Sequence, residues 1–357
     1  DQVYMNALQL ISGQGGWPLN MIALPDGRPI WGGTYFPKER WMQVLTQIST
    51  LAREKPEELI QYADNLEKGL AHFEVDEPLK EGLNIEEITA GLDQLVSKKD
   101  AQNGGLIGAP KFMMPTLLRF FQQGGILCSN KDARDHFHFS LEQMALGGIF
   151  DAVHGGFSRY AVDAEWHIPH FEKMGYDNGQ LISLYAQAHR EEPKALYQET
   201  IDKTISFLKK ELYAPEGGFY AALDADSLNV NQKLVEGAFY VWTKNEIQEL
   251  FPKEYLQVAA YYAINDDGYW EEGNYVLRRM QTDEVFAKLL GLELSELKVK
   301  VIRWNAALLK ERNKRARPRL DDKIICSWNA ILSSGFLDAY RSFGDSAYKD
   351  LALKNLA

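Results

Sequence analysis

Apolar and polar positions follow two different periods along the chain. Residues 18–36 (PLNMIALPDGRPIWGGTYF) place β-branched and aromatic residues on both sides of Asp26-Gly27, a dipeptide typical of hairpin turns, so we expect two short antiparallel strands here. Most of the remaining chain has the spacing of amphipathic helices. The expected helices cover residues 40–52, 56–73, 85–98, 114–124, 131–150, 177–190, 194–212, 245–263, 282–290, 294–312 and a segment from 328 onward.

Both ends of the chain have helical patterns without helix boundaries. Residues 1–12 begin in mid-pattern, with no cap or lead-in before them. Residues 346–357 keep Leu351, Leu353 and Leu356 in apolar positions and have no C-cap glycine. These features predict that the chain is a fragment of a longer protein.

One kind of loop recurs between the predicted helices. Gly-Gly followed by an apolar residue occurs at 104–106, 155–157 and 217–219. The segments that start at Asn178 (NGQLISLYAQAH) and Asn329 (NAILSSGFLDAY) share Asn, Leu, an aromatic residue and Ala at equivalent steps. Repeated helical hairpins of about 50–70 residues are typical of a closed α/α toroid, because each hairpin buries its apolar face on a neighbour. We therefore expect a mainly α fold.

Six blocks of sequence, in this order, resemble the spermatogenesis-associated protein 20 family, whose bacterial and archaeal members are called thioredoxin-domain-containing proteins. The blocks are GGWPLNMIALPDGRPIWGGTYFP at 15–37, APKF at 109–112, GGFSRYAVDAEWHIPHFEKMGYDN at 155–178, LDADS at 223–227, EGAFYVWT at 236–243 and DDKIICSWNA at 321–330. The resemblance extends over nearly the whole chain.

This resemblance implies a thioredoxin-like domain followed by an (α/α)6 toroid similar to N-acylglucosamine 2-epimerase and the six-hairpin glycosidases. It implies that the family's reactive CxxC lies upstream of residue 1 and that the Trp17-Pro18 bond is cis. Residues 1–39 would then be the C-terminal hairpin piece of the thioredoxin-like α/β domain. Residues 40–357 would be an incomplete toroid that lacks its last hairpins.

A dense group of polar and aromatic residues lies at 160–178 and leads into a predicted helix. His170 and Glu172 suit acid–base chemistry, because imidazole titrates near neutral pH and a neighbouring carboxylate tunes it. Asp177 and Asn178 suit helix N-caps equally well. A buried, hydrogen-bonded structural histidine is the alternative role for His170.

The same segment contains residue types that bind metals. His167 and His170 are three residues apart, with Glu172 nearby. However, Pro169 interrupts the helical register that would align them, and no third ligand has diagnostic spacing. We therefore expect no metal and no other cofactor.

Further acidic residues precede other predicted helices. Asp224 and Asp226 follow a short GGFY segment, and Asp322 precedes the helix at Trp328. Helix N-termini favour carboxylates in any case. Because the loops at one end of a toroid surround its cavity, we nevertheless expect these residues to converge on the 160–178 segment. The candidate catalytic residues are His170, Glu172, Asp177, Asp224, Asp226 and Asp322.

Carbohydrate sites combine carboxylates with flat aromatic faces and with amides that bracket hydroxyl groups. The candidate substrate-binding residues are Tyr160, Trp166, Asn178, Trp242, Trp328 and Asn329. Each aromatic ring could equally belong to the core, where large aromatic side chains usually lie.

Composition narrows the class of protein. The 357 residues include 39 basic and 50 acidic side chains, a net charge of −11 that disfavours binding to nucleic acid or to anionic membranes. Cys128 and Cys326 are the only cysteines, so the chain has neither a CxxC pair nor a disulfide framework. No apolar run has the roughly 18 residues of a membrane helix. We expect a cytoplasmic protein without membrane or nucleic-acid partners.

The resemblance and the acid-aromatic clusters together predict a carbohydrate-active toroid fused to a thioredoxin-like domain. Its chemistry would be that of a sugar epimerase, an isomerase or a glycoside hydrolase, with a small sugar or sugar-like molecule as ligand. Alternatively, the thioredoxin-like domain acts in redox chemistry while the toroid is a binding scaffold without catalysis. The sequence does not determine the oligomeric state.

Overall fold

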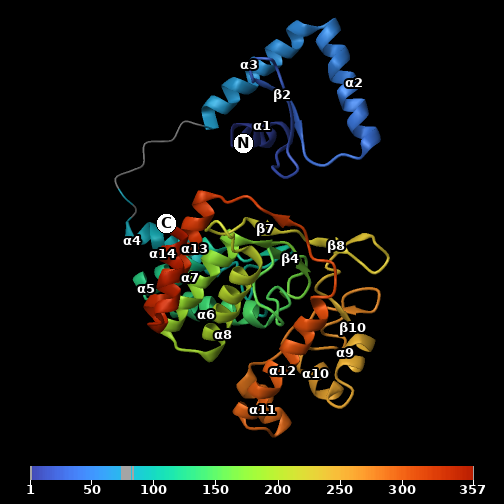
Figure 1. Ribbon diagram of the computed structural model, residues 1–357. Coiled ribbons are helices and arrows are strands. Elements are labelled where there is room, and N and C mark those ends of the chain that lie inside the picture. Colours follow the sequence, from blue (N-terminus) through green and yellow to red (C-terminus); the bar gives the residue numbers. More distant parts are fainter. Residues whose placement is uncertain (1, 74–81, 83, 357) are drawn as a thin grey trace. The chain divides into compact units, whose positions relative to one another are not determined.

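The computed structural model describes residues 2–73, 82 and 84–356 of the chain (Figure 1). It divides into two compact units, Asp1–Leu83 and Asn84–Ala357. Each unit is described by itself below.

The first unit contains the predicted strand pair. Strand β1 (Asn20–Ala23) pairs antiparallel with β2 (Pro29–Gly33), with Asn20 opposite Gly33. The Asp26 carboxylate accepts a hydrogen bond from the backbone N–H of Arg28 at 3.0 Å and closes the turn between them. The helices of this unit are α1 (Gln2–Ser12), α2 (Lys38–Glu54) and α3 (Pro56–Phe73). The hairpin predicted at Asp26-Gly27 is therefore confirmed.

Helices α1 and α3 pack against β2, and α2 packs against α3. The small core of the unit contains Ile30, Leu59 and Ala63. By packing, α2 and α3 thus belong with the strand pair, whereas the sequence-based division falls between residues 39 and 40. The domain boundary between residues 39 and 40, which the resemblance implies, remains a prediction. The Trp17-Pro18 bond is cis, as the resemblance implied.

The second unit is built mainly from helices that pair with their neighbours in the chain: α5 with α6, α7 with α8, and α13 with α14. Its helices are α4 (Ile85–Val96), α5 (Pro115–Leu127), α6 (Lys131–Leu146), α7 (Gly175–Glu191), α8 (Ala195–Phe207), α9 (Lys244–Leu250), α10 (Tyr255–Tyr261), α11 (Asp283–Leu290), α12 (Leu294–Arg312), α13 (Cys326–Phe343) and α14 (Ser346–Leu356). The mainly α class and the helical hairpins predicted from the sequence are confirmed.

Helices α7 and α13, which carry the matching Asn segments, also pack closely on each other. Gly335 of α13 makes this approach possible, because a Cβ atom there would lie 2.5 Å from the carbonyl oxygen of Gly179 in α7. The two repeats are therefore in direct contact through positions that exclude a side chain.

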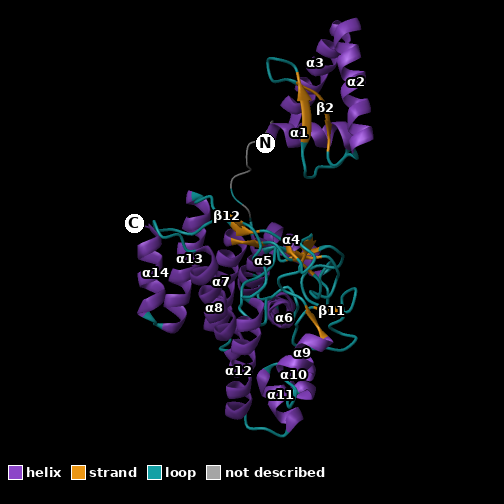
Figure 2. Cartoon of the chain, turned by 45° about the vertical axis from the view of Figure 1, so that its right-hand side comes forward, coloured by secondary structure: helices purple, strands orange, loops and turns teal. Residues whose placement is uncertain are grey.

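Short strands lie among the loops of the second unit (Figure 2). One sheet has the order β3-β4-β5 and another the order β12-β7-β6, with all neighbours antiparallel; β8 pairs with β9, and β10 with β11. The strands are β3 (Lys111–Phe112), β4 (Tyr160–Ala161), β5 (Pro169–His170), β6 (Lys173–Met174), β7 (Ala222–Leu223), β8 (Asp226–Leu228), β9 (Leu234–Glu236), β10 (Trp242–Thr243), β11 (Asn274–Tyr275) and β12 (Leu320–Asp321). Because β6 leads directly into α7, these sheets position the segment at 160–178.

Two helix predictions were wrong in extent. The helix expected at 245–263 is divided into α9 and α10, because Pro252 lacks the N–H that a continuous helix needs. The helix expected at 131–150 ends at Leu146 because Gly147 and Gly148 follow. A Cβ atom at Gly148 would lie 2.0 Å from the carbonyl oxygen of His167.

None of the helices within the described residues is long and apolar enough to cross a lipid bilayer.

Candidate functional site

His170 lies on β5 beside the ring of Tyr160 and several charged groups. In the antiparallel pair of β4 and β5, His170 is directly opposite Tyr160. The two rings stack with centroids 4.9 Å apart and an angle of 16° between their planes. Phe112 of β3 packs on Tyr160 in turn, at 4.7 Å. Strand pairing thus brings a half-buried imidazole onto an aromatic ring.

Two carboxylates lie beside the His170 imidazole. Its Nδ1 atom is 2.7 Å from Oε1 of Glu236, the last residue of β9. Its Nε2 atom is 3.9 Å from Oε2 of Glu172. The guanidinium of Arg159 donates to that same Glu172 oxygen at 3.0 Å. A histidine with carboxylates on both nitrogens is an arrangement that can accept and release a proton.

Asp177 lies in the first turn of α7 and is buried. Its Oδ2 atom has no hydrogen-bond partner within the described residues. Burial raises the pKa of Asp177 to about 7, the Glu172 carboxylate adds to the rise, and Arg159 opposes it. Glu172 and Arg159, which lie near His170, thus also act on Asp177 electrostatically, while no hydrogen bond or ion pair joins Asp177 to His170 within the described residues. Because of its raised pKa, the Asp177 carboxyl group can hold a proton near neutral pH.

The aromatic rings of Tyr176 and Trp328 pack against each other, and Tyr176 directly precedes Asp177 in the chain. Their rings meet edge to face, with centroids 4.6 Å apart. Burial, together with the neighbouring Asp177 carboxylate, raises the pKa of Tyr176. Trp328 is half-buried at the start of α13. The structure thus brings Trp328, predicted from the sequence as a binding residue, to the element that carries Asp177.

The other predicted carboxylates are less closely associated with this cluster. Asp224 and Asp322 are exposed, and no hydrogen bond or ion pair links either of them to His170 or Asp177 in the part of the chain that the structure describes. Asp226, half-buried on β8, lies opposite Glu236 in the strand pair. Their convergence on one cavity therefore remains a prediction.

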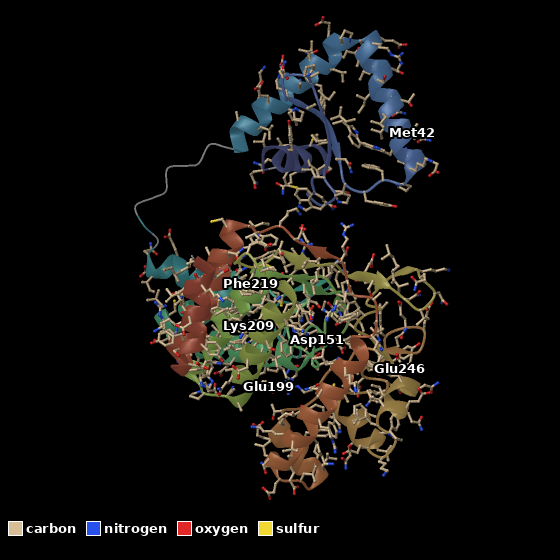
Figure 3. All side chains as sticks on the ribbon, viewed as in Figure 1. Met42, Asp151, Glu199, Lys209, Phe219 and Glu246 are labelled. Atoms are coloured by element: carbon tan, nitrogen blue, oxygen red, sulfur yellow. The ribbon has the colours of Figure 1, made fainter. Side chains whose placement is uncertain are left out.

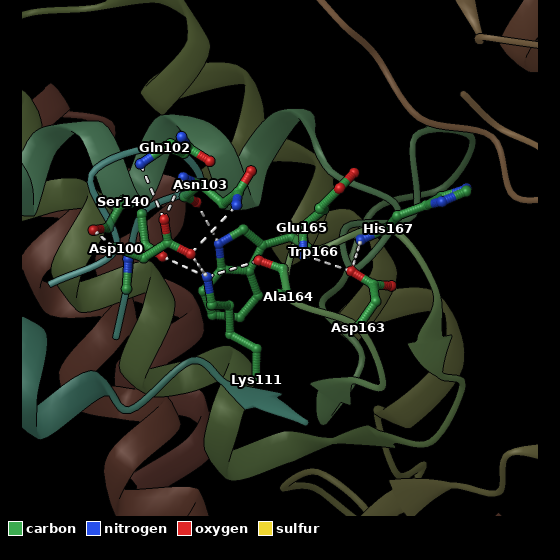
Figure 4. Close-up of polar contacts among 12 residues, drawn as sticks. Asp100, Gln102, Asn103, Lys111, Ser140, Asp163, Ala164, Glu165, Trp166 and His167 are labelled. Carbon is green, nitrogen blue, oxygen red and sulfur yellow. Dashed lines mark hydrogen bonds and ion pairs between the residues drawn. The ribbon is translucent and has the colours of Figure 1, made fainter. Parts of the chain in front are cut away.

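Trp166 has the contacts of a core residue. Its side chain is enclosed, with 1% of the residue exposed, and its indole N–H donates to the carbonyl oxygen of Asn103 at 2.8 Å (Figure 4). The ammonium group of Lys111 lies 5.2 Å from the centre of its ring and is itself held by Asp100 at 2.6 Å. An enclosed ring presents no face to a ligand, so these contacts favour the structural alternative for Trp166.

Trp242 is also fully buried, in a second core cluster, and the guanidinium of Arg315 lies 4.1 Å from the centre of its ring. One face of this ring is therefore occupied by a side chain of the protein itself. The structural alternative is favoured here as well.

Asn178 and Asn329 make equivalent hydrogen bonds in the two matching helices. The amide oxygen of Asn178 accepts from the N–H of Phe157 at 2.7 Å, and its amide nitrogen donates to the Phe157 carbonyl at 3.1 Å. Asn329 binds Phe219 in the same way, at 2.7 and 3.0 Å. Each asparagine thus holds the aromatic residue of a Gly-Gly loop. These contacts explain both residues as structural clamps.

Sequence reasoning missed Glu236 and Arg159 as members of the cluster. Glu236 is 66 positions from His170, and nothing in its local sequence marks it as the partner of a histidine. Arg159 lies in the same sequence block, 155–178, as His170, so the sequence does hint that the two residues are close together. Within residues 2–73 and 84–356 no group of three or more His, Cys, Asp or Glu side chains is arranged to hold a metal ion.

The fold and the site together define a class: a mainly α protein of helical hairpins with charged and aromatic side chains near the start of α7. Comparison with proteins of known sequence identifies the relatives of this chain. The chain is 34% identical to an uncharacterized protein of Caenorhabditis elegans, over 99% of this chain and 52% of that protein. It is 31% identical to human spermatogenesis-associated protein 20, over 94% of this chain and 47% of that protein. The resemblance inferred from the six sequence blocks is confirmed.

The chain spans about half the length of the curated relatives it matches. In addition, residues 1–71 match the family model Thioredox_DsbH, described as a protein of unknown function, DUF255. The thioredoxin-like family expected for the beginning of the chain is therefore matched.

Solved structures with a similar chain path include two sugar enzymes. Cellobiose 2-epimerase from Spirochaeta thermophila is 17% identical, with a TM-score of 0.35, over 76% of this chain and 83% of the enzyme. A D-mannose isomerase is 13% identical, with a TM-score of 0.30, over 75% of this chain and 84% of the enzyme. These activities are those of the two enzymes.

Proposed function

We propose that the second unit binds a small polyhydroxyl molecule, a sugar or sugar derivative, beside His170 and Asp177 and performs acid–base chemistry on it. The observation that carries this proposal is the buried Asp177 carboxyl, which has an unpartnered oxygen and a pKa of about 7. The charge of Glu172, which acts on Asp177, lies beside the half-buried His170 imidazole. In the proposal, the Asp177 carboxyl supplies a proton donor and the His170 imidazole a proton acceptor.

In this proposal each residue has a distinct role. His170 accepts a proton from the ligand, and Asp177 donates one. Glu172 stabilises the imidazolium that forms, since its carboxylate lies 3.9 Å from Nε2. Trp328, which is half-buried, offers ring surface to the apolar face of a sugar, whereas Tyr160 supports the imidazole on which its ring stacks. Either removal and return of a proton on a sugar carbon or protonation of a glycosidic oxygen would use this pair.

The test is isotope exchange and hydrolysis with a panel of mono- and disaccharides. The chain is incubated with each sugar in D2O, and NMR measures deuterium at carbon-bound positions while a reducing-sugar assay measures hydrolysis. We expect one of the two reactions, with at least a 100-fold loss in His170→Ala and Asp177→Asn. Glu271→Gln, at an exposed carboxylate outside the cluster, should keep the wild-type rate.

Absence of exchange, hydrolysis and ligand binding across the panel would contradict the proposal. Binding that is weakened by both variants, without any turnover, would instead favour the scaffold alternative, in which the thioredoxin-like domain of the longer protein performs the chemistry. The match of residues 1–71 to the Thioredox_DsbH model fits both candidate functions, since both include a thioredoxin-like domain.

A further inference from the structure

We propose that Glu236, carried by the β8–β9 hairpin, is a positioning residue that holds the His170 imidazole in its Nδ1–H tautomer and leaves Nε2 as the proton acceptor of the site. The catalytic meaning of this inference rests on the proposed function. The tautomer itself is a property of the ligand-free chain and can be measured without a substrate.

The contact between the two side chains defines the direction of the hydrogen bond. Oε1 of Glu236 lies 2.7 Å from Nδ1 of His170. A carboxylate has only acceptor oxygens, so the hydrogen of this bond belongs to the ring nitrogen. In the neutral imidazole the other nitrogen, Nε2, then carries the free lone pair. Nε2 is the atom that a general base would use.

The position of Glu236 is fixed by the packing of the hairpin base. The next residue, Gly237, has a φ of +72°, and a Cβ atom there would lie 2.5 Å from the ring of Phe171. The N–H of Gly237 donates to the carbonyl oxygen of Ala225 at 3.1 Å. Phe171 directly follows His170 in the chain and stacks on Tyr240 at 5.6 Å. The base of the β8–β9 hairpin therefore packs against Phe171, the residue next to His170.

The remaining neighbours leave the imidazole little freedom to rotate. Tyr160 of β4 stacks on its face, and Glu172 lies 3.9 Å from Nε2. Arg159 holds the Glu172 carboxylate at 3.0 Å, so that oxygen is already engaged in an ion pair. Three segments thus surround the ring, and among the residues that the structure describes only Glu236 makes a short hydrogen bond to it. Carboxylate–imidazole contacts of this type fix the tautomer in other histidine sites.

The decisive measurement is a long-range 1H–15N correlation spectrum of the ligand-free chain labelled at histidine. His170 is assigned among the seven histidines by its loss in His170→Ala. In the neutral ring we expect the Nδ1–H tautomer in the wild type. In Glu236→Leu this preference should be lost, with the Nε2–H form becoming at least half of the population.

Two further variants keep the test decisive. Glu271→Leu removes an exposed carboxylate from another turn and should leave the His170 spectrum unchanged. If Glu236→Leu does not fold, Glu236→Gln replaces it, because an amide can donate as well as accept and should give a mixture of tautomers. Unchanged amide spectra establish that the variants are folded.

An Nε2–H tautomer in the wild type, or an unchanged Nδ1–H tautomer in both Glu236 variants, would overturn the inference. Where a sugar substrate is found, Glu236→Leu should lower kcat by about 10-fold or more with little change in KM. Failure to find a substrate would contradict the proposed function, but the tautomer measurement would still decide the role of Glu236.

Discussion

Asp177 couples the pH to the stability of the fold. In the folded chain its pKa is about 7, whereas the ordinary value is 3.8. Between these values the folded state holds a proton that the unfolded state has lost, so the free energy of unfolding falls as the pH rises. Each pKa unit corresponds to roughly 1.4 kcal/mol. Above about pH 7 both states are ionised and this dependence ends.

We expect Asp177→Asn to be more stable than the wild type at pH 8, because its amide does not ionise. Its advantage should shrink by roughly 2–3 kcal/mol between pH 8 and pH 5. Urea unfolding across this range measures the difference. Asp266→Asn, at an exposed position, is the control. Parallel pH profiles for Asp177→Asn and the wild type would show that the carboxyl titrates as an ordinary aspartate.

The two asparagine clamps predict matched losses of stability. Asn178→Ala leaves the buried N–H and C=O of Phe157 without their partners, and Asn329→Ala does the same for Phe219. An unsatisfied buried group costs roughly 1–3 kcal/mol. We therefore expect each variant to lose about 3 kcal/mol in urea unfolding. Asn231→Ala, at an exposed turn, should lose less than about 0.5 kcal/mol.

At the scale of elements, two of the Gly-Gly loops bind a lysine from a following strand through the same pair of contacts. In the first loop Lys111 of β3 donates to Asp100 at 2.6 Å and to the Gly104 carbonyl at 2.9 Å. In the second loop Lys173 of β6 makes the same two contacts, both at 2.9 Å, with Asp151 and Gly155. Each lysine therefore anchors a strand to the loop that precedes it.

The second loop carries an additional cation. Arg312, at the end of α12, lies 3.0 Å from the Asp151 carboxylate, whose side chain is only 9% exposed. Figure 3 labels Asp151 within the second unit. Burial alone would raise the pKa of Asp151, but the charges of Arg312 and Lys173 outweigh burial and hold it well below its ordinary range. A loop, a strand and a helix from distant parts of the sequence thus meet at one carboxylate.

Asp151→Asn should consequently be among the most destabilising single changes in the chain. It leaves two buried cations without a counter-charge, and breaking a buried pair in this way costs roughly 3–5 kcal/mol. Adding Lys173→Met should restore part of the loss. A double-mutant cycle in urea measures this coupling. Strictly additive losses would mean that the two residues do not act as a pair.

At the scale of the whole molecule, the two units have separate cores. The large apolar clusters contain only residues of the second unit, whereas Ile30, Leu59 and Ala63 form a small cluster in the first. We expect residues 84–357, expressed alone, to unfold cooperatively and to keep the His170–Glu236 contact. Circular dichroism and calorimetry test this expectation. A broad transition without a heat-absorption peak would mean that the second unit depends on residues 1–83.

The cysteines make a prediction about redox activity. Cys326 is exposed and Cys128 is half-buried against Thr89, and these two thiols are 198 positions apart in the sequence. Thiol–disulfide exchange of the CxxC type needs two adjacent thiols. We expect this chain to reduce insulin no faster than its Cys128→Ser/Cys326→Ser variant. A faster rate would assign redox activity to the chain.

Local pattern was sufficient for the first strand pair and for most of the helices, but not for the short strands β3 to β12. The hairpin at Asp26-Gly27 and the helices follow from turn chemistry and from apolar spacing, which depend on near neighbours in the chain. The sequence also shows that the segments starting at Asn178 and Asn329 repeat each other. It does not show the hydrogen bonds that these two asparagines make to Phe157 and Phe219. The apolar periodicity continues across Pro252, so periodicity alone does not show that the helix is interrupted there.

The sequence by itself determined which chemistry is available: one segment, 160–178, that concentrates histidine, carboxylates and aromatic rings. Only the tertiary structure decided how these groups act. Burial gives Asp177 its raised pKa, and pairing across 66 positions brings Glu236 to His170. Likewise, Trp166 and Trp242 are enclosed by segments far away in the chain. Burial and distant pairing depend on the whole fold, so no local pattern contains them.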